Sequence, residues 1–308
     1  MADLNDGRGQ IILVAAFALG VIFIALAVVV NAAIFTENLA TRGEATSDSD
    51  ALHYRHEVEE SAGRALDYVN AEGTGSVSDF KRNLTNISLQ GTRQKARLGR
   101  VVNVGDVSSV VSGKRFENQT GSFVKENSSI NWKLGNNISQ TRQFVLNISS
   151  ISATTYGDAF KTSVFESSTG PYWNMSVFKN TTSGKLNITI KNTNNNVEYC
   201  EVPLSGNVEI DITSGTVNGE NCYALQRNDS NVMWFAAGLS SPYNIRFVNG
   251  DAVSGGYRGI VDLSPTGDIE STANSENAIY SLNVNYTYQT PSLYYETDIR
   301  VAPGEPDL

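Results

Sequence analysis

Residues 11–30 read IILVAAFALGVIFIALAVVV and contain no charged or strongly polar side chain. About 20 helical residues cover the ~30 Å hydrocarbon layer of a bilayer, whereas a cleavable signal peptide has an apolar region of only about 7–15 residues. A second apolar patch, residues 32–35, follows directly after Asn31. We therefore expect one transmembrane helix over residues 10–35 that anchors the chain in membrane lipid.

Helical patterns continue beyond this anchor. Gly43 and the polar run 44–50 predict a break, after which residues 47–50 would cap a second helix with apolar residues at helical spacing. Gly73 and Gly75 would end that helix. Ser78 is the expected cap of a third helix, whose basic residues near its C-terminal end favour the helix dipole. Residues 36–100 are thus predicted to form a helical stalk.

From residue 101 onward, short runs rich in Val, Ile, Tyr, Phe and Thr alternate with Gly, Asn, Asp and Ser. This pattern predicts many turn-bounded strands in a largely antiparallel sandwich, and hence an α+β protein with a β-rich domain over residues 101–308. On residues 185–191, apolar and polar side chains alternate, which places Asn187 on the solvated face. The clearest predicted strands are 144–151, 172–178, 185–191, 197–202, 208–213, 232–236, 243–248, 257–263, 279–288 and 293–301.

The two cysteines, Cys200 and Cys222, both lie in the predicted β-domain. In an oxidising compartment they would form a disulfide that closes a loop of about 22 residues and stabilises the fold by roughly 3 kcal/mol. The alternative is a pair of buried, unbonded thiols.

The chain carries an excess of N-x-S/T triplets, which is typical of an exported and glycosylated surface. The alternative is that Asn, Ser and Thr simply collect in turns between strands. Charge gives little help with orientation, because Arg8 and Arg42 lie on opposite sides of the apolar run. We expect the C-terminal bulk to lie outside the cytoplasm, at the cell membrane. The triplets begin at Asn83, Asn86, Asn118, Asn127, Asn137, Asn147, Asn174, Asn180, Asn187, Asn228 and Asn285.

The triplet Arg8-Gly9-Gln10 stands immediately before the apolar run, after a short hydrophilic leader over residues 1–9. This arrangement resembles the cleavage region of archaeal type IV pilin-like precursors and archaellins. The resemblance implies cleavage between Gly9 and Gln10, and partners of the same kind that pack through the apolar helix. Many type IV pilins carry Glu five residues into the mature chain, where this sequence has Val14. The alternative is an ordinary uncleaved signal anchor.

Two further stretches, residues 31–42 and 300–304, look like parts of a group of uncharacterised haloarchaeal membrane-anchored, pilin-like proteins. The resemblance covers the first ~70 residues and the C-terminal tail. What it implies is a structural role at the cell surface.

Catalytic patterns are sparse. His53 and His56 share a helix face with Glu57 and Glu60, but their spacing differs from that of a zincin helix, so a solvated face is the simpler interpretation. No phosphate-binding loop or calcium loop stands out, and we expect no cofactor. The three tryptophans, Trp132, Trp173 and Trp234, could line a sugar-binding cleft, although tryptophans more often pack a core.

The chain has 32 Asp and Glu against 23 Lys and Arg, a net charge of −9, which disfavours nucleic acid as a partner. Together these features predict a non-enzymatic, membrane-anchored surface protein that acts as a pilin-like or pseudopilin-like subunit. The alternative is an anchored module that binds a glycan or a surface partner.

Overall fold

The computed structural model describes residues 6–72, 75–166, 170–194, 197–225 and 239–306. The predicted strand at 232–236, the sequon at Asn228 and Trp234 lie outside these ranges. Two α-helices precede the sheet, and the short 3-10 helices η2 (Gly250–Ala252) and η3 (Ser271–Ala273) lie among its later strands. The element bounds are α1 (Asp6–Ala71), α2 (Val77–Ala96), β1 (Val101–Asn118), β2 (Trp132–Ile151), β3 (Phe160–Phe165), β4 (Tyr172–Lys179), β5 (Leu186–Asn192), β6 (Val197–Val202), β7 (Val208–Asp211), β8 (Thr216–Val217), β9 (Glu220–Asn221), β10 (Tyr243–Val248), β11 (Val253–Ile269), β12 (Ser275–Gln289) and β13 (Tyr294–Val301).

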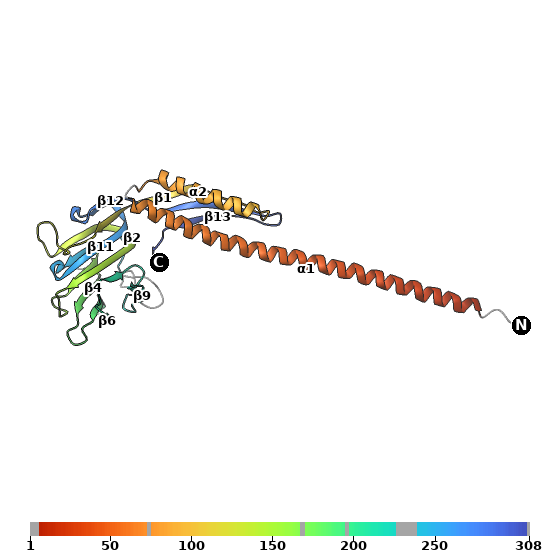
Figure 1. The fold of residues 1–308 in the computed structure, drawn as a ribbon, viewed down its shortest axis with the longest axis horizontal. Coiled ribbons are helices and arrows are strands. Elements are labelled where there is room, and N and C mark those ends of the chain that lie inside the picture. Colours follow the sequence, from red (N-terminus) through yellow and green to blue (C-terminus); the bar gives the residue numbers. More distant parts are fainter. Residues whose placement is uncertain (1–5, 73–74, 167–169, 195–196, 226–238, 307–308) are drawn as a thin grey trace.

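Helix α1 is continuous over 66 residues, so the predicted break near Gly43 is wrong. A single glycine inside a helix costs only about 1 kcal/mol, and α1 contains no proline that would interrupt its hydrogen bonds. The N-terminal part of α1 projects far from the rest of the molecule, and only its C-terminal part lies along the sheet (Figure 1).

Helix α2 begins two residues earlier than the sequence suggests. Its N-cap is Ser76 rather than Ser78, because the Ser76 hydroxyl accepts a hydrogen bond from the backbone N–H of Asp79 at 3.4 Å. Phe80 and Leu84, four residues apart on one face of α2, are buried. Both helices cover the same end of the sheet (Figure 1).

The strands form an antiparallel sheet with the order β13-β12-β1-β11-β2-β10-β3-β4-β5-β6, and β7, β8 and β9 branch from β2. The predicted α+β class and the antiparallel β-rich domain are therefore confirmed. Four strands were not predicted, namely β1, β3 and the two-residue strands β8 and β9. Strand β1 is irregular, with register shifts after Gly105 and Ser108 and positive φ at Asp106 and Ser109, and these features obscure its alternation.

Among the described residues, the sheet contributes to two large hydrophobic cores and to a small cluster of Ile260, Ala278 and Tyr280. One lies between the helices and the strands β1, β12 and β13, and includes Val58, Leu66 and Ile299. The other joins strands far apart in the sheet order, with Phe144 of β2 and Ile188 of β5 in the same cluster. Since β2 and β5 are separated by three strands, this half of the sheet must curl around its own core, which gives the sandwich-like character.

Candidate functional site

The apolar span is a membrane-compatible helix with no packing partner inside the molecule. Residues Leu13–Thr36 of α1 are long and apolar enough to cross a bilayer, and none of their side chains is buried. Among the parts of the chain that the structure describes, this is the one helix of that kind, and it fits a membrane anchor or a signal sequence. The candidate processing residues Gly9 and Gln10 lie near the start of the same helix.

The C-terminal third of α1 is fixed to the sheet by buried hydrogen bonds. The Asn70 amide donates to the carbonyl of Ile279 and accepts from its N–H, both at 2.9 Å. The Tyr286 hydroxyl donates to the Ala51 carbonyl at 3.0 Å, and burial raises the pKa of this tyrosine. These contacts lie at both ends of the packed segment, so they hold the helix in one position along the sheet.

A fully buried arginine, Arg142 on β2, lies between α1 and the sheet. Its guanidinium donates to the Tyr280 carbonyl at 3.2 Å and to the Asp67 carboxylate at 3.0 Å. Burial lowers the pKa of Arg142 and raises that of Asp67, while their mutual attraction acts in the opposite direction on both. The Arg142 side chain is fully buried whereas that of Asp67 is 56% exposed, so the pair joins a buried cation on β2 to a partly solvated carboxylate on α1. The sequence gives no signal for it beyond a basic residue inside an apolar strand.

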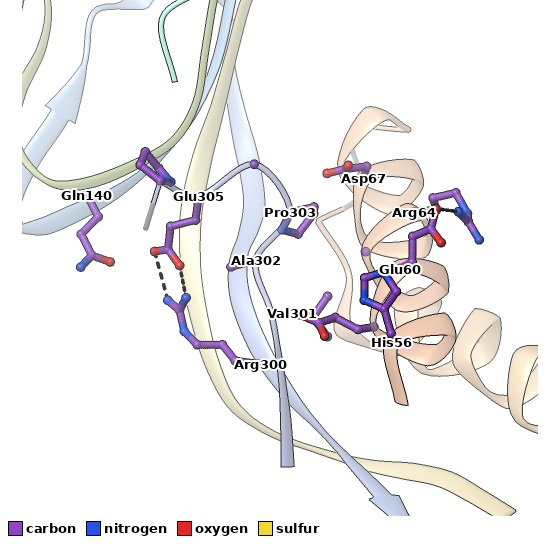
Figure 2. Close-up of a pocket in the computed structure, with 14 residues that line it drawn as sticks. His56, Glu60, Arg64, Asp67, Gln140, Arg300, Val301, Ala302, Pro303 and Glu305 are labelled. Atoms are coloured by element: carbon purple, nitrogen blue, oxygen red, sulfur yellow. Dashed lines mark hydrogen bonds and ion pairs between the residues drawn. The ribbon is translucent and has the colours of Figure 1, made fainter. Parts of the chain in front are cut away.

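A cleft of about 780 Å³ opens beside this pair, between α1 and the C-terminal segment. Figure 2 shows Arg300 paired with Glu305 on one side and Arg64 paired with Glu60 on the other. Glu305 also accepts a hydrogen bond from the Tyr280 hydroxyl at 2.8 Å. The charges around the cleft are therefore largely paired, but each pair lies on one side of the cleft and neither joins the C-terminal segment to α1.

The two histidines are not brought together as a metal site. His56 lines the cleft, whereas His53 is exposed and lies 3.4 Å from Glu57 in an i,i+4 pair. Within the described ranges, no group of three or more His, Cys, Asp or Glu residues is arranged to hold a metal ion. Trp132 and Trp173 are buried in the larger core, as the packing interpretation predicts.

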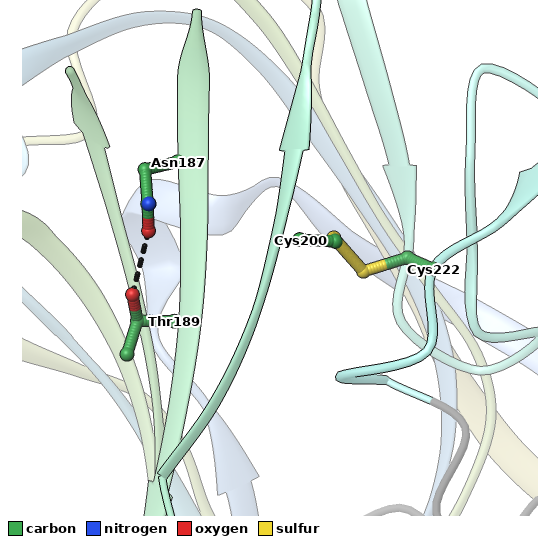
Figure 3. The surroundings of a disulfide bond; sticks show 4 residues. All are labelled: Asn187, Thr189, Cys200 and Cys222. Atoms are coloured by element: carbon green, nitrogen blue, oxygen red, sulfur yellow. Dashed lines mark hydrogen bonds between the residues drawn. A yellow bond between two sulfur atoms is a disulfide. The ribbon is translucent and has the colours of Figure 1, made fainter. Parts of the chain in front are cut away.

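The predicted disulfide is present between Cys200 and Cys222, with a Cα–Cα distance of 5.9 Å (Figure 3). Its position in the topology is informative. Cys200 lies on β6, at the end of the route β2-β10-β3-β4-β5-β6, and Cys222 directly follows β9, at the end of the route β2-β7-β8-β9. The disulfide joins the two ends, so it closes the curled half of the sheet into a ring.

The structure corrects the expected exposure of Asn187. This residue and Thr189 are each only 8% exposed, and the Thr189 hydroxyl donates to the Asn187 side-chain oxygen at 2.6 Å (Figure 3). Alternation along β5 predicted a solvated face, but burial on this strand extends to both faces. Asn187 is therefore a poor acceptor for a glycan.

The other sequon asparagines vary in exposure. Asn86 on α2 and Asn127 in the loop between β1 and β2 are exposed, and are therefore accessible. The half-buried ones are Asn83, Asn118, Asn137, Asn147, Asn174, Asn180 and Asn285.

Comparison with models of known protein families, with curated proteins and with solved structures finds no match to this chain.

Proposed function

We propose that this protein is a membrane-anchored surface protein that acts as a structural, pilin-like subunit, with its β-domain outside the cytoplasm. Its apolar helix would anchor the chain in lipid and pack against the same helix in other copies. The β-domain would then be presented at a fixed position above the membrane.

The uninterrupted helix carries this proposal. The unpacked apolar part of α1 continues without a break into the part that is clamped to the sheet, so a movement of one is transmitted to the other. Nothing lies within 4 Å of a Cβ built on Gly20, and Ala16 lies one turn earlier on the same face. Small residues at this spacing allow two helices in a membrane to approach closely.

The compartment is supported by independent features. A disulfide persists in oxidising surroundings, and it joins two ends of a sheet that would otherwise be held by short strands. At least two sequons, at Asn86 and Asn127, are on the accessible surface. An orientation with the domain outside the cytoplasm accounts for both.

Processing is tested by the intact mass of the protein purified from its native membrane. A chain that starts at Gln10 supports the pilin-like resemblance, whereas retention of residues 1–9 would favour an ordinary signal anchor.

Assembly through the helix is tested by a matched pair of substitutions. Gly20→Leu places a large side chain on the small-residue face, while Ala25→Leu places the same side chain about 140° around the helix at about 100° per residue. We expect Gly20→Leu to reduce the fraction of cross-linked oligomers in membranes and Ala25→Leu to leave it near the wild-type value. Equal effects of the two variants, or monomers throughout, would contradict assembly through this face.

A further inference from the structure

The outer face of the curled half-sheet carries a row of polar side chains without an acidic member. Cross-strand register pairs connect five strands, β2, β10, β3, β4 and β5, and side chains paired in this way point to the same face. Four inter-strand spacings of about 4.8 Å make the row about 19 Å long. Its members in order are Lys133, Arg246, Ser163, Asn174 and Lys191.

Two of these residues are like charges placed directly opposite each other. Lys133 and Arg246 are exposed register partners, an arrangement that destabilises a sheet. Both cations also lie over the same ring, with the Lys133 ammonium 5.9 Å and the Arg246 guanidinium 4.9 Å from the centre of Phe165. The ring holds the two positive groups side by side. An arrangement that costs stability in the free protein is explained if an anion occupies the space between them.

No carboxylate of the described residues forms an ion pair with either cation. Glu166 lines the same cleft as the two cations, but its carboxylate accepts hydrogen bonds from the Ser240 N–H at 2.5 Å and the Ser240 hydroxyl at 2.9 Å. By contrast, Arg115 and Arg258 elsewhere on the sheet are both paired with glutamates. On a chain of net charge −9, two adjacent cations without an acidic partner are unusual.

These cations border a cleft of about 560 Å³, within the size range of small-molecule sites. The Ser163 hydroxyl donates to the Asn174 side-chain oxygen at 2.5 Å, which orients the Asn174 amide. The Tyr172 ring also lines the cleft. Within the described parts of the chain, neither the Asn174 amide nitrogen nor the Tyr172 hydroxyl forms a hydrogen bond, so both are available to a ligand.

We propose that this cleft binds a short acidic oligosaccharide, one that carries carboxylate or sulfate groups. Arginine presents a planar fork that matches such groups with two parallel hydrogen bonds, and lysine adds a second positive charge. The amide, the hydroxyl and the aromatic ring suit the hydroxyl groups and apolar faces of a sugar. A long polyanion such as nucleic acid is disfavoured by the net charge of the whole molecule.

The acidic sugar has two possible sources, a separate glycan or a glycan attached to Asn174, which is itself a sequon inside the cleft. The proposal does not depend on assembly through α1, because the cleft lies entirely within the β-domain. A result that contradicts assembly through α1 therefore does not contradict ligand binding in the cleft, and the reverse also holds.

The test uses the full chain in a non-ionic detergent, produced in a host without N-glycosylation so that Asn174 is bare. Calorimetry would compare a trimer of galacturonic acid with the neutral galactose trimer. We expect at least tenfold tighter binding of the acidic trimer, and at least tenfold weaker binding of it by the Lys133→Gln and Arg246→Gln variants. Lys185→Gln is the matched control, because Lys185 is exposed at the opposite end of β5, and should change binding less than twofold.

Equal affinity for the two trimers, unchanged binding by Arg246→Gln, or no binding of the acidic trimer up to 10 mM (about −3 kcal/mol) would overturn the proposal. The source is resolved with protein from a glycosylating host. Ser176→Ala removes the sequon and keeps Asn174. If this variant binds the acidic trimer and the glycosylated wild type does not, the attached glycan is the natural occupant; if the variant and the wild type bind equally, the natural ligand is a separate glycan.

Discussion

Removing the disulfide should open the curled half of the sheet while the half packed against the helices remains closed. The perturbation is the double variant Cys200→Ser, Cys222→Ser. Without this bond, β6 becomes a free end of the sheet, and the other end depends on β8 and β9, which have two residues each. Such short pairings contribute few hydrogen bonds, so we expect the strands on both sides of the missing bond to separate first.

The magnitude follows from the loop that the bond closes. The two cysteines are 22 residues apart, and the chain-entropy model gives about 3 kcal/mol for a loop of that length. Because proteins unfold with a free energy of about 5–15 kcal/mol, the disulfide contributes a large fraction of the total stability. With a guanidinium slope of about 4–6 kcal/mol/M, the unfolding midpoint should fall by about 0.5–0.8 M.

Tryptophan fluorescence measures the midpoint, because Trp132 and Trp173 are buried in the core that the ring encloses. Serine in place of the buried Cys222 adds a hydroxyl to an apolar site, so an alanine double variant and chemical reduction of the wild type are the controls. Hydrogen exchange locates the effect and should quicken in residues 197–225 more than in β12. The ring closure would be refuted if the free energy of unfolding fell by less than about 1 kcal/mol in the serine variant, the alanine variant and the reduced wild type. It would also be refuted if hydrogen exchange increased equally in both halves of the sheet.

Three other outcomes are expected. Leu19→Arg places a charge near the middle of the apolar span at a cost of about 2.5–3.5 kcal/mol, so less protein should resist carbonate extraction from membranes; wild-type levels would contradict a single span. Mass spectrometry of native peptides should find glycan on Asn86 or Asn127 and none on Asn187, and a modified Asn187 would show that β5 is exposed during modification. Burial raises the pKa of Tyr257 to about 12, above the ordinary value near 10, so the folded state loses stability as pH rises from about 10 to 12. Tyrosine ionisation, measured by absorbance at 295 nm, should therefore accompany unfolding, measured by circular dichroism. Ionisation of every tyrosine while the fold stays intact would contradict this prediction.

Sequence patterns located the elements that are defined by local periodicity. Strands β6 and β10 begin and end where alternation predicts, and the apolar span coincides with an exposed helix. The predicted break at Gly43 was wrong because helix propensity is a weak local preference, and a continuous helix satisfies every backbone group at a cost of about 1 kcal/mol.

The features that sequence could not predict depend on register and topology. Asn187 is buried because of what covers β5, which alternation along a single strand does not reveal. The opposition of Lys133 and Arg246 follows from pairing between β2 and β10, more than a hundred residues apart in the chain. The disulfide was predicted from the cysteine pair alone, but its role in closing the sheet required the order of the strands.

The geometry divides the molecule into a part that determines position and a part that remains available for recognition. The polar contacts of Asn70, Arg142 and Tyr286 lie between α1 and the sheet, where they hold the helix in one position; among the atoms of these three side chains, the buried Nε of Arg142 has no hydrogen-bond partner within the described residues. The cations near Phe165 lie on the opposite half of the β-domain, exposed and without a carboxylate partner among the described residues. Groups that fix a structure are expected to be satisfied within it, whereas groups that bind a ligand are satisfied only when the ligand is present. On that criterion, we propose that α1 and its contacts with the sheet serve assembly and orientation, and that the cleft on the outer face of the curled half-sheet serves recognition.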